Sequence, residues 1–93
     1  VDFETVKEYS LSQNYPNPFN PSTEINYTLA KSGNITLKIY NLLGSEIATL
    51  VSGFMEAGKH SVKFDATDIT SGIYFYTIKA DNFTSTRKMI LMK

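Results

Sequence analysis

The sequence predicts an all-β fold, an immunoglobulin-like antiparallel β-sandwich of seven strands. Three observations support this prediction. Several runs alternate between apolar and polar residues, with the period of two that is typical of a strand with one buried face. Turn-forming residues separate these runs about every 8–12 residues, which is the spacing found in small sandwiches. No stretch shows the apolar period of a long helix.

Length and composition bound the class of protein. The chain has 93 residues, which suits one domain; we expect residues 1–8 to be a linker from a preceding domain and residues 9–93 to be the folded unit. Nine basic residues balance nine acidic ones, which argues against nucleic acid as a partner because phosphate binding needs a basic surplus. Without cysteine, disulfides and thiolate metal sites are excluded. No apolar run reaches the ~18 residues of a transmembrane segment.

The first part of the chain is expected to form a short strand, at Tyr9–Gln13, and then a rigid crossing. The crossing, residues 14–21, contains three prolines, which fix φ and remove backbone donors. We expect it to be an irregular connection that inserts Tyr15 and Phe19 at the rim of the core.

Two alternating runs follow. Residues 23–29 would turn Ile25, Tyr27 and Leu29 inward, and residues 35–40 would turn Ile35, Leu37 and Ile39 inward. The short turn around Gly33 and Asn34 predicts that these two strands pair as a hairpin.

The next segments carry clear turn signals. Asn41–Gly44 is typical of a type I turn followed by a left-handed glycine. Ser45–Val51 is a weaker strand, whose broken alternation predicts a bulge or an edge position. Residues 52–59 are expected to be a loop, and the strand after it places His60, Val62 and Phe64 on one side. Residues 65–72 would then cross the fold, with room for one helical turn capped by Asp65 or Thr67.

Ser71–Lys79 is predicted to be the central strand because it is apolar on both faces. Ile73 and Phe75 would lie on one face, and Tyr74, Tyr76 and Ile78 on the other. We therefore expect a second sheet to cover one face, and loops or a partner to cover the other. After a tight turn at Ala80–Asn82, residues 83–93 would form the last strand.

The residues that could carry chemistry do not predict an enzyme, and no cofactor is expected. His60 is the one histidine, Ser61 would point to the opposite face of its strand, and no nucleophile lies at a recognisable spacing. Asp65, Asp68 and Asp81 are scattered rather than gathered in a calcium loop. No glycine-rich loop precedes a helix to hold a phosphate.

The aromatic residues allow an alternative function. Tyr40, Tyr74 and Tyr76 could form an exposed platform that stacks on sugar rings, as in a carbohydrate-binding module. The competing interpretation is that Tyr74 and Tyr76 pack in or beside the core. A module that binds another protein, or a structural spacer beside a catalytic domain, are further alternatives.

The terminal run is apolar between Met89 and Met92 and is flanked by Arg87, Lys88 and Lys93. A final strand at the edge of a sheet leaves backbone donors and acceptors free. One interpretation is simply a last core strand, and the functional hypothesis adds that a receptor strand or groove engages this edge by β-augmentation.

Five blocks resemble the type A C-terminal sorting domain of type IX secretion cargo, which ends many secreted proteins of the Bacteroidetes and their relatives. The blocks are Tyr15–Thr23, Leu37–Asn41 with Gly44, Gly58–Ala66, Ser71–Tyr76 and Thr86–Lys93. They lie in the family's order, and the resemblance extends from about Tyr9 to Lys93.

The resemblance implies a seven-stranded sandwich that acts as a non-catalytic address for an attached cargo. The outer-membrane translocon would read it after the cargo has crossed the inner membrane, and a cell-surface sortase would typically remove it, leaving the cargo secreted or attached to lipopolysaccharide at the cell surface. The family's signal maps to Lys88, Met89, Ile90, Leu91, Met92 and Lys93. Its other marked positions map to Pro16, Asn17, Pro18, Phe19, Asn20, Pro21, Gly44 and Gly72.

Overall fold

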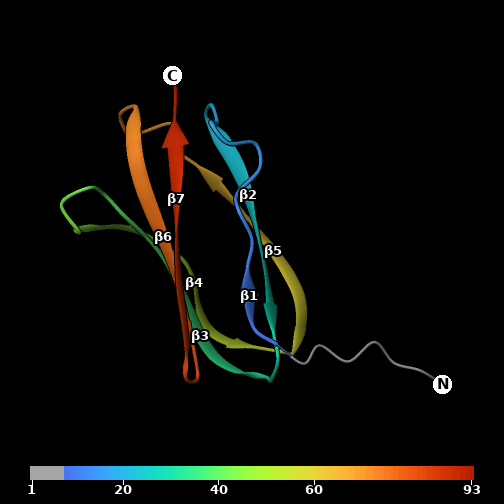
Figure 1. The fold of residues 1–93 in the computed structure, drawn as a ribbon. Coiled ribbons are helices and arrows are strands. Elements are labelled where there is room, and N and C mark those ends of the chain that lie inside the picture. The colour runs from blue at the N-terminus through green and yellow to red at the C-terminus, as the bar shows by residue number, and fades with distance from the viewer. Residues whose placement is uncertain (1–7) are drawn as a thin grey trace.

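The computed structural model describes residues 8–93, which form two antiparallel β-sheets (Figure 1). The strands are β1 (Ser10–Leu11), β2 (Ser22–Leu29), β3 (Gly33–Tyr40), β4 (Glu46–Met55), β5 (Gly58–Asp65), β6 (Gly72–Ala80) and β7 (Phe83–Leu91). One sheet has the order β1-β2-β5, and the other has the order β4-β3-β6-β7. The predicted all-β sandwich of seven strands is confirmed. The predicted linker, residues 1–8, falls almost wholly outside the described residues.

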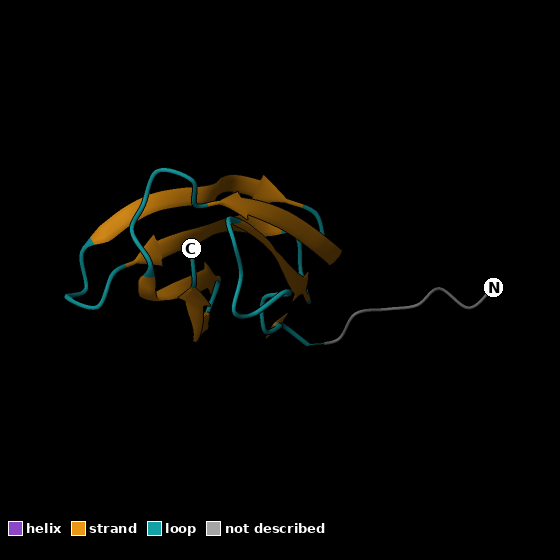
Figure 2. Cartoon of the chain, turned by 90° about the horizontal axis from the view of Figure 1, so that it is seen from above, coloured by secondary structure: helices purple, strands orange, loops and turns teal. Residues whose placement is uncertain are grey.

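The core lies between the two sheets and is filled by alternate side chains. The large buried apolar residues of three central strands are Ile25, Tyr27 and Leu29 in β2, Ile35, Leu37 and Ile39 in β3, and Tyr74, Tyr76 and Ile78 in β6. The sets in β2 and β3 are those that the alternation predicted to face inward; for β6 the sequence predicted the two faces but not which of them meets the second sheet. Seen from above, strands make up most of the folded part, and loops join them (Figure 2).

The central position of β6 is confirmed, because it pairs with β3 on one side and with β7 on the other. The expected cover of its second face by loops is wrong for the described part of the chain, and the alternative, cover by a partner, stays a prediction. Ile73 remains 36% exposed and Phe75 is only half-buried. The outer face of this sheet is therefore open.

The predicted hairpin between residues 23–29 and 35–40 is wrong. β2 pairs with β1 and β5, whereas β3 pairs with β4 and β6, so the chain crosses from one sheet to the other between them. Alternation fixes which face of a strand is buried. It does not distinguish two neighbours in one sheet from two strands that face each other across the same core.

The predicted loop at residues 52–59 is also wrong, because β4 continues to Met55 and β5 begins at Gly58. β4 does lie at a sheet edge, and its register against β3 shifts twice, as the broken alternation predicted. The missed strand end contains Gly53 with φ 141° and Phe54 exposed by 64%. A twisted edge of this kind lacks the regular pattern from which strands are predicted.

The turns follow the sequence signals closely. In the β3–β4 turn the N–H of Asn41 donates to the carbonyl of Ser45 at 3.0 Å, and Gly44 has φ 84°, so the left-handed glycine is confirmed. The β6–β7 turn has two residues, with Asp81 at φ 54°. The Asp65 carboxylate caps the N–H of Thr67 at 3.0 Å, but this crossing forms a single turn rather than a helical one.

The first strand is shorter than the predicted Tyr9–Gln13. The paired residues of β1 are Ser10 and Leu11, which lie opposite Thr28 and Tyr27 of β2. The chain then leaves the sheet and runs beside β7 before it enters β2 (Figure 1). This course brings the proline-rich part of the chain against its last strand.

Candidate functional site

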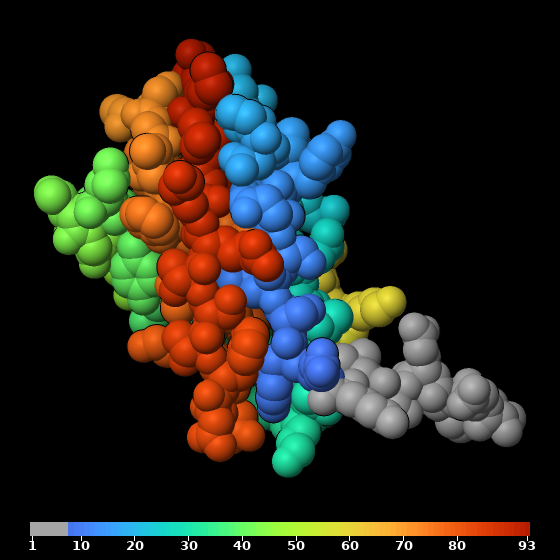
Figure 3. Space-filling view, in the orientation of Figure 1, coloured from blue at the N-terminus to red at the C-terminus, as the bar shows by residue number. Residues whose placement is uncertain are grey.

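Two segments from opposite ends of the sequence meet at one edge of the sandwich. We call residues 13–21 the proline-rich segment, Lys88–Lys93 the terminal segment, and their contact the terminal junction. In Figure 3 the blue atoms of the proline-rich segment lie directly beside the red atoms of the terminal segment. The junction contains most of the residues that the sequence marked as functional.

Main-chain bonds join the two segments around Phe19. The N–H of Phe19 donates to the carbonyl of Ile90 at 2.9 Å, and the N–H of Met92 donates to the carbonyl of Phe19 at 3.0 Å. These bonds make a parallel bridge between Phe19 and Leu91. The proline-rich segment thus supplies one strand-like residue to the outer edge of the four-stranded sheet.

Two side chains extend this contact. The Oδ1 of Asn17 accepts a hydrogen bond from the N–H of Ile90 at 3.0 Å, and the Nε2 of Gln13 donates to the carbonyl of Lys88 at 2.7 Å. Together with the bonds of Phe19, four backbone groups on the outer edge of the terminal segment have partners. The expectation of a free edge here is therefore wrong. Prolines cannot form a regular strand, but the residues between them supply single hydrogen bonds.

The aromatic residues of the proline-rich segment have opposite environments. Phe19 is 2% exposed, and its ring centroid lies 6.2 Å from that of Phe64. Its predicted insertion into the core is confirmed. Tyr15 is 79% exposed, so the same prediction is wrong for Tyr15. The backbone of Tyr15 forms a bridge with Glu24, and the alternation of side chains then allows its ring to point outward.

A buried polar cluster holds the start of the proline-rich segment. Asn14 is 2% exposed; its backbone N–H donates to the Tyr76 hydroxyl at 2.8 Å, and its Nδ2 donates to the Thr23 hydroxyl at 3.0 Å. The Tyr76 hydroxyl in turn donates to the carbonyl of Ser12 at 2.6 Å. Burial raises the pKa of Tyr76, and the hydrogen bond from Asn14 and the charge of Arg87 oppose this rise. The cluster thus ties the segment to both sheets.

Sequence reasoning missed this cluster. Asn14 precedes Tyr15 and Pro16, and an asparagine ahead of a proline turn often bonds to nearby backbone. Its Nδ2 does donate to the carbonyl of Pro16, at 3.2 Å. That local signal could have indicated a capping role, but nothing local indicated the contact with Tyr76.

The C-terminal end is fastened by the crossing between β5 and β6. The N–H of Lys93 donates to the Ser71 hydroxyl at 3.0 Å, and its Nζ donates to the carbonyl of Thr67 at 2.6 Å. Hydrogen bonds from Thr67 lower the pKa of Asp65, and the charges of Lys63 and Lys93 lower it further. The N–H of Ala66 also donates to the carbonyl of Pro21 at 2.8 Å, so all three segments meet here.

The marked residues of the two segments divide between core and surface. Within the terminal segment Met89 and Leu91 are buried, Ile90 is half-buried, and Lys88, Met92 and Lys93 are exposed. In the proline-rich segment Phe19 alone among the marked residues is buried; the exposed ones are Pro16, Asn17, Pro18, Asn20 and Pro21. The junction therefore has a buried anchor and an exposed, partly basic rim.

The two glycines at the family's marked positions, Gly44 and Gly72, lie in different parts of the fold. Gly72 pairs with Leu91 and has φ 155°, so it lies beside the terminal segment. Gly44 lies in the β3–β4 turn, which joins the opposite edge strand of the same sheet. Its left-handed φ of 84° explains why this position holds a glycine, and no contact with the junction is needed to explain it.

The predicted tyrosine platform is wrong. Tyr76 is fully buried and Tyr74 is 7% exposed, which confirms their packing in the core. Tyr40 pairs with Phe75 on the opposite face of the sheet. The three rings therefore cannot line one surface for a sugar.

Other parts of the described chain offer little for catalysis. His60 is half-buried; its ring stacks on Tyr27 with centroids 5.3 Å apart, and its Nε2 lies 2.7 Å from the carbonyl of Glu56. Among residues 8–93 no three His, Asp or Glu side chains gather closely enough to hold a metal ion. Nor does this part of the chain contain a helix long and apolar enough to span a membrane.

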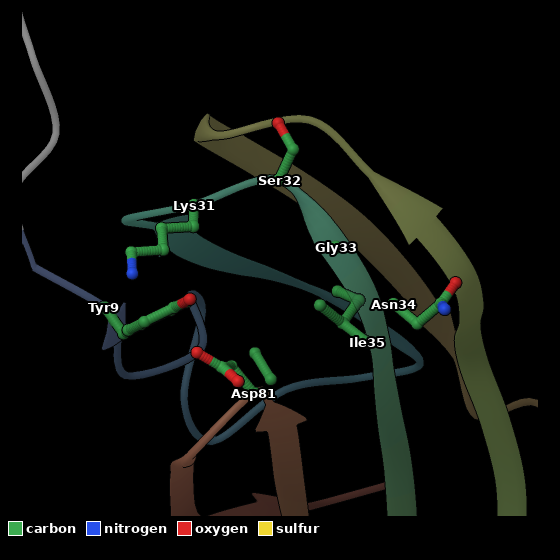
Figure 4. A pocket seen from close by; sticks show the side chains of 8 residues that line it. Tyr9, Lys31, Ser32, Gly33, Asn34, Ile35 and Asp81 are labelled. Carbon is green, nitrogen blue, oxygen red and sulfur yellow. The ribbon is translucent and has the colours of Figure 1, made fainter.

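A shallow hollow of about 320 Å³ lies at the end of the sandwich where β1 begins. Figure 4 shows Tyr9, Lys31 and Asp81 at its border, from three separate segments. The Tyr9 ring also stacks on Phe83, with centroids 5.3 Å apart. At this hollow the start of the folded chain packs beside the β6–β7 turn. The hollow lies away from the junction.

Comparison with known proteins identifies one family. The model of the secretion system C-terminal sorting domain matches residues 13–92, which include both segments of the junction. No curated protein and no solved structure matches the chain.

Proposed function

Since the chain belongs to the family of secretion system C-terminal sorting domains, we propose that the outer-membrane type IX translocon recognises its folded terminal junction. Membership in the family makes the chain a non-catalytic sorting signal for a cargo protein, and it implies secretion of that cargo across the outer membrane. In this proposal the translocon recognises particular exposed atoms of the signal, and further steps follow export.

The closed edge of the terminal segment is the observation that carries this proposal. Because Gln13, Asn17 and Phe19 engage the backbone groups of Lys88, Ile90 and Met92, a receptor strand could pair there only after displacing the proline-rich segment. Displacement would expose the buried ring of Phe19 and the polar groups around Asn14, and both changes are costly. Recognition of exposed side chains is the less costly route.

The exposed rim has a definite chemistry. Lys88 and Lys93 place positive charge at the two ends of the terminal segment, and Met92 is 58% exposed between them. The exposed amide of Asn20 adds a polar group from the proline-rich segment. A receptor surface with acidic groups and a small apolar contact would be complementary to this rim.

The later steps are proposed in the order that the family resemblance implies. The attached cargo passes from the periplasm through the translocon, and a cell-surface sortase then removes the domain. The cargo is thereby released or anchored at the cell surface. The folded sandwich, with its buried anchor at the junction, would keep the rim presented during these steps.

Truncation alone tests the proposal poorly, because removing residues 88–93 also removes Met89 and Leu91 from the core. A sharper experiment changes only exposed atoms. A reporter fused to the domain would carry Lys88→Glu, Met92→Ser and Lys93→Glu together, and circular dichroism of the purified fusion would confirm the fold. Lys63→Glu, an exposed lysine on β5, is the matched control.

In cells with the type IX machinery, the triple variant should stay in the periplasm while the control reaches the medium or the cell surface. Normal export of a folded triple variant would contradict recognition of the exposed rim. It would leave the membership of the family unaffected.

A further inference from the structure

The outer face of the four-stranded sheet carries an ordered row of side chains. Lys88 of β7 lies opposite Phe75 of β6, Phe75 opposite Tyr40 of β3, and Tyr40 opposite Glu46 of β4. The row therefore crosses all four strands, with two aromatic rings in the centre, a positive charge at one end and a negative charge at the other. The inner-facing neighbours Tyr74, Tyr76 and Met89 are buried.

This face is open and partly apolar. Next to the row, Ile73 pairs with Ile90 on the same face, and Ile73 is 36% exposed. The β3–β4 turn adds Leu42 and Leu43, which are 64% and 90% exposed. In Figure 3 this turn projects at the left, beside the atoms of β6. Exposed apolar residues gathered in one region of a small domain are typical of an interaction site.

We propose that this face binds the same face of a second copy of the chain, about a two-fold axis parallel to the strands. Such a rotation reverses the strand order across the interface. Lys88 of each copy then lies opposite Glu46 of the other, and Phe75 opposite Tyr40. The row is thus complementary to itself, as a two-fold interface requires.

The remaining charges on the face agree with this arrangement. In the rows beyond Phe75 and Tyr40, Lys38 pairs with Thr77, and Lys79 pairs with Thr36. The same rotation places each of these lysines opposite a threonine of the second copy. Among the described residues of these rows no two like charges are brought together, so charge selects this pairing over a sideways shift.

Glu46 can bind Lys38 of its own chain and Lys88 of the second copy at the same time. It already accepts Lys38 at 3.1 Å and the Thr49 hydroxyl at 2.9 Å. A carboxylate has about four lone-pair sites, so acceptor sites remain for a lysine of the second copy. Its side chain is 43% exposed, which leaves it within reach.

The size of the face indicates a weak dimer. Four strands at about 4.8 Å spacing and four side-chain rows at about 7 Å give a footprint of roughly 500 Å² per copy. This is below the ~800 Å² per partner of a standard stable interface. We therefore expect a dissociation constant on the order of 10 μM or weaker.

Sedimentation equilibrium of the 93-residue chain tests the proposal, with circular dichroism to confirm each fold. The wild-type chain should dimerise at ~100 μM, and Phe75→Glu should lower its association at least tenfold. Lys88→Glu and Glu46→Lys should each be monomeric alone, because each places like charges opposite one another. When these two variants are mixed, every end of the row again meets an opposite charge, and the mixture should recover a dimer.

The Lys63→Glu variant, changed on the other sheet, should dimerise as the wild type does. A wild-type chain that stays monomeric up to about 1 mM would overturn the proposal. Failure of the mixed folded variants to associate more strongly than either one alone would also overturn it. The dimer face and the exposed rim share Lys88, so Phe75→Glu and Glu46→Lys, which leave the rim unchanged, separate dimerisation from recognition by the translocon.

Discussion

The backbone N–H of Phe19 donates to the carbonyl of Ile90 at 2.9 Å and thereby joins the proline-rich segment to the last strand of the fold. The Phe19 ring is buried at the same place. One residue therefore combines an edge hydrogen bond with a core anchor. This relationship explains why a segment with three prolines can close a sheet edge.

The anchor of the junction should be essential for stability. Replacing the buried ring in Phe19→Ala should lower the free energy of unfolding by about 3–5 kcal/mol, because transfer energy is lost and a cavity remains. Urea unfolding followed by circular dichroism measures this change. Tyr15→Ala, in the same segment but 79% exposed, should cost less than about 0.5 kcal/mol. Equal losses for the two variants would contradict the assigned anchor.

The buried polar cluster should depend on the Asn14 side chain. Asn14→Ala removes the bonds to the Thr23 hydroxyl, the Pro16 carbonyl and Gln13. Leaving buried partners unpaired should cost about 1–3 kcal/mol of unfolding free energy, measured by the same urea titration. Asn26→Ala on the exposed face of β2 serves as control and should be nearly neutral. An unchanged free energy of unfolding in Asn14→Ala would contradict this prediction and would show that water replaces these bonds.

Acid should weaken the crossing that holds the C-terminal end. The pKa of Asp65 is lowered from 3.8 by the Thr67 hydrogen bonds and then by Lys63 and Lys93. A lowered folded pKa means that the ionised group stabilises the fold above its unfolded pKa. This contribution is lost as the pH falls below 3.8 through the folded pKa. Melting temperatures measured across this range should fall less for Asp65→Asn than for the wild type. Superimposable profiles would exclude a contribution from this carboxylate.

Gly44 should matter for its backbone conformation alone. With φ 84° and open space around its Cα, Gly44→Ala meets no clash but must adopt the left-handed region. The expected loss is about 1 kcal/mol, seen as a lower urea midpoint. Gly33 also has open space but no positive φ, so Gly33→Ala should be neutral or slightly stabilising. The reverse order of the two variants would contradict this explanation.

The sequence predicted faces of strands better than their partners. The inward sets of β2 and β3 follow from alternation, and the turns at Gly44 and Asp81 follow from local residue types. In β6 both faces are apolar, so alternation alone does not show which face is inward. The predicted pairing of β2 with β3 is wrong because alternate residues face the core in the same way whether two strands are neighbours in one sheet or lie in two facing sheets. Asn14 and Asn17 bond to residues far away in sequence, and such contacts leave no local pattern. The closed edge at Ile90 therefore required the structure.

Amide hydrogen exchange of the terminal segment tests the central claim most directly. Successive outward N–H groups of β7 face the same edge, so Ile90 and Met92 can be compared with Thr86, which lies beyond the proline-rich segment. If the edge is closed, the amides of Ile90 and Met92 should exchange at least about 100-fold more slowly than that of Thr86. Equally fast exchange at all three amides would show that the edge is free and would contradict the closed junction.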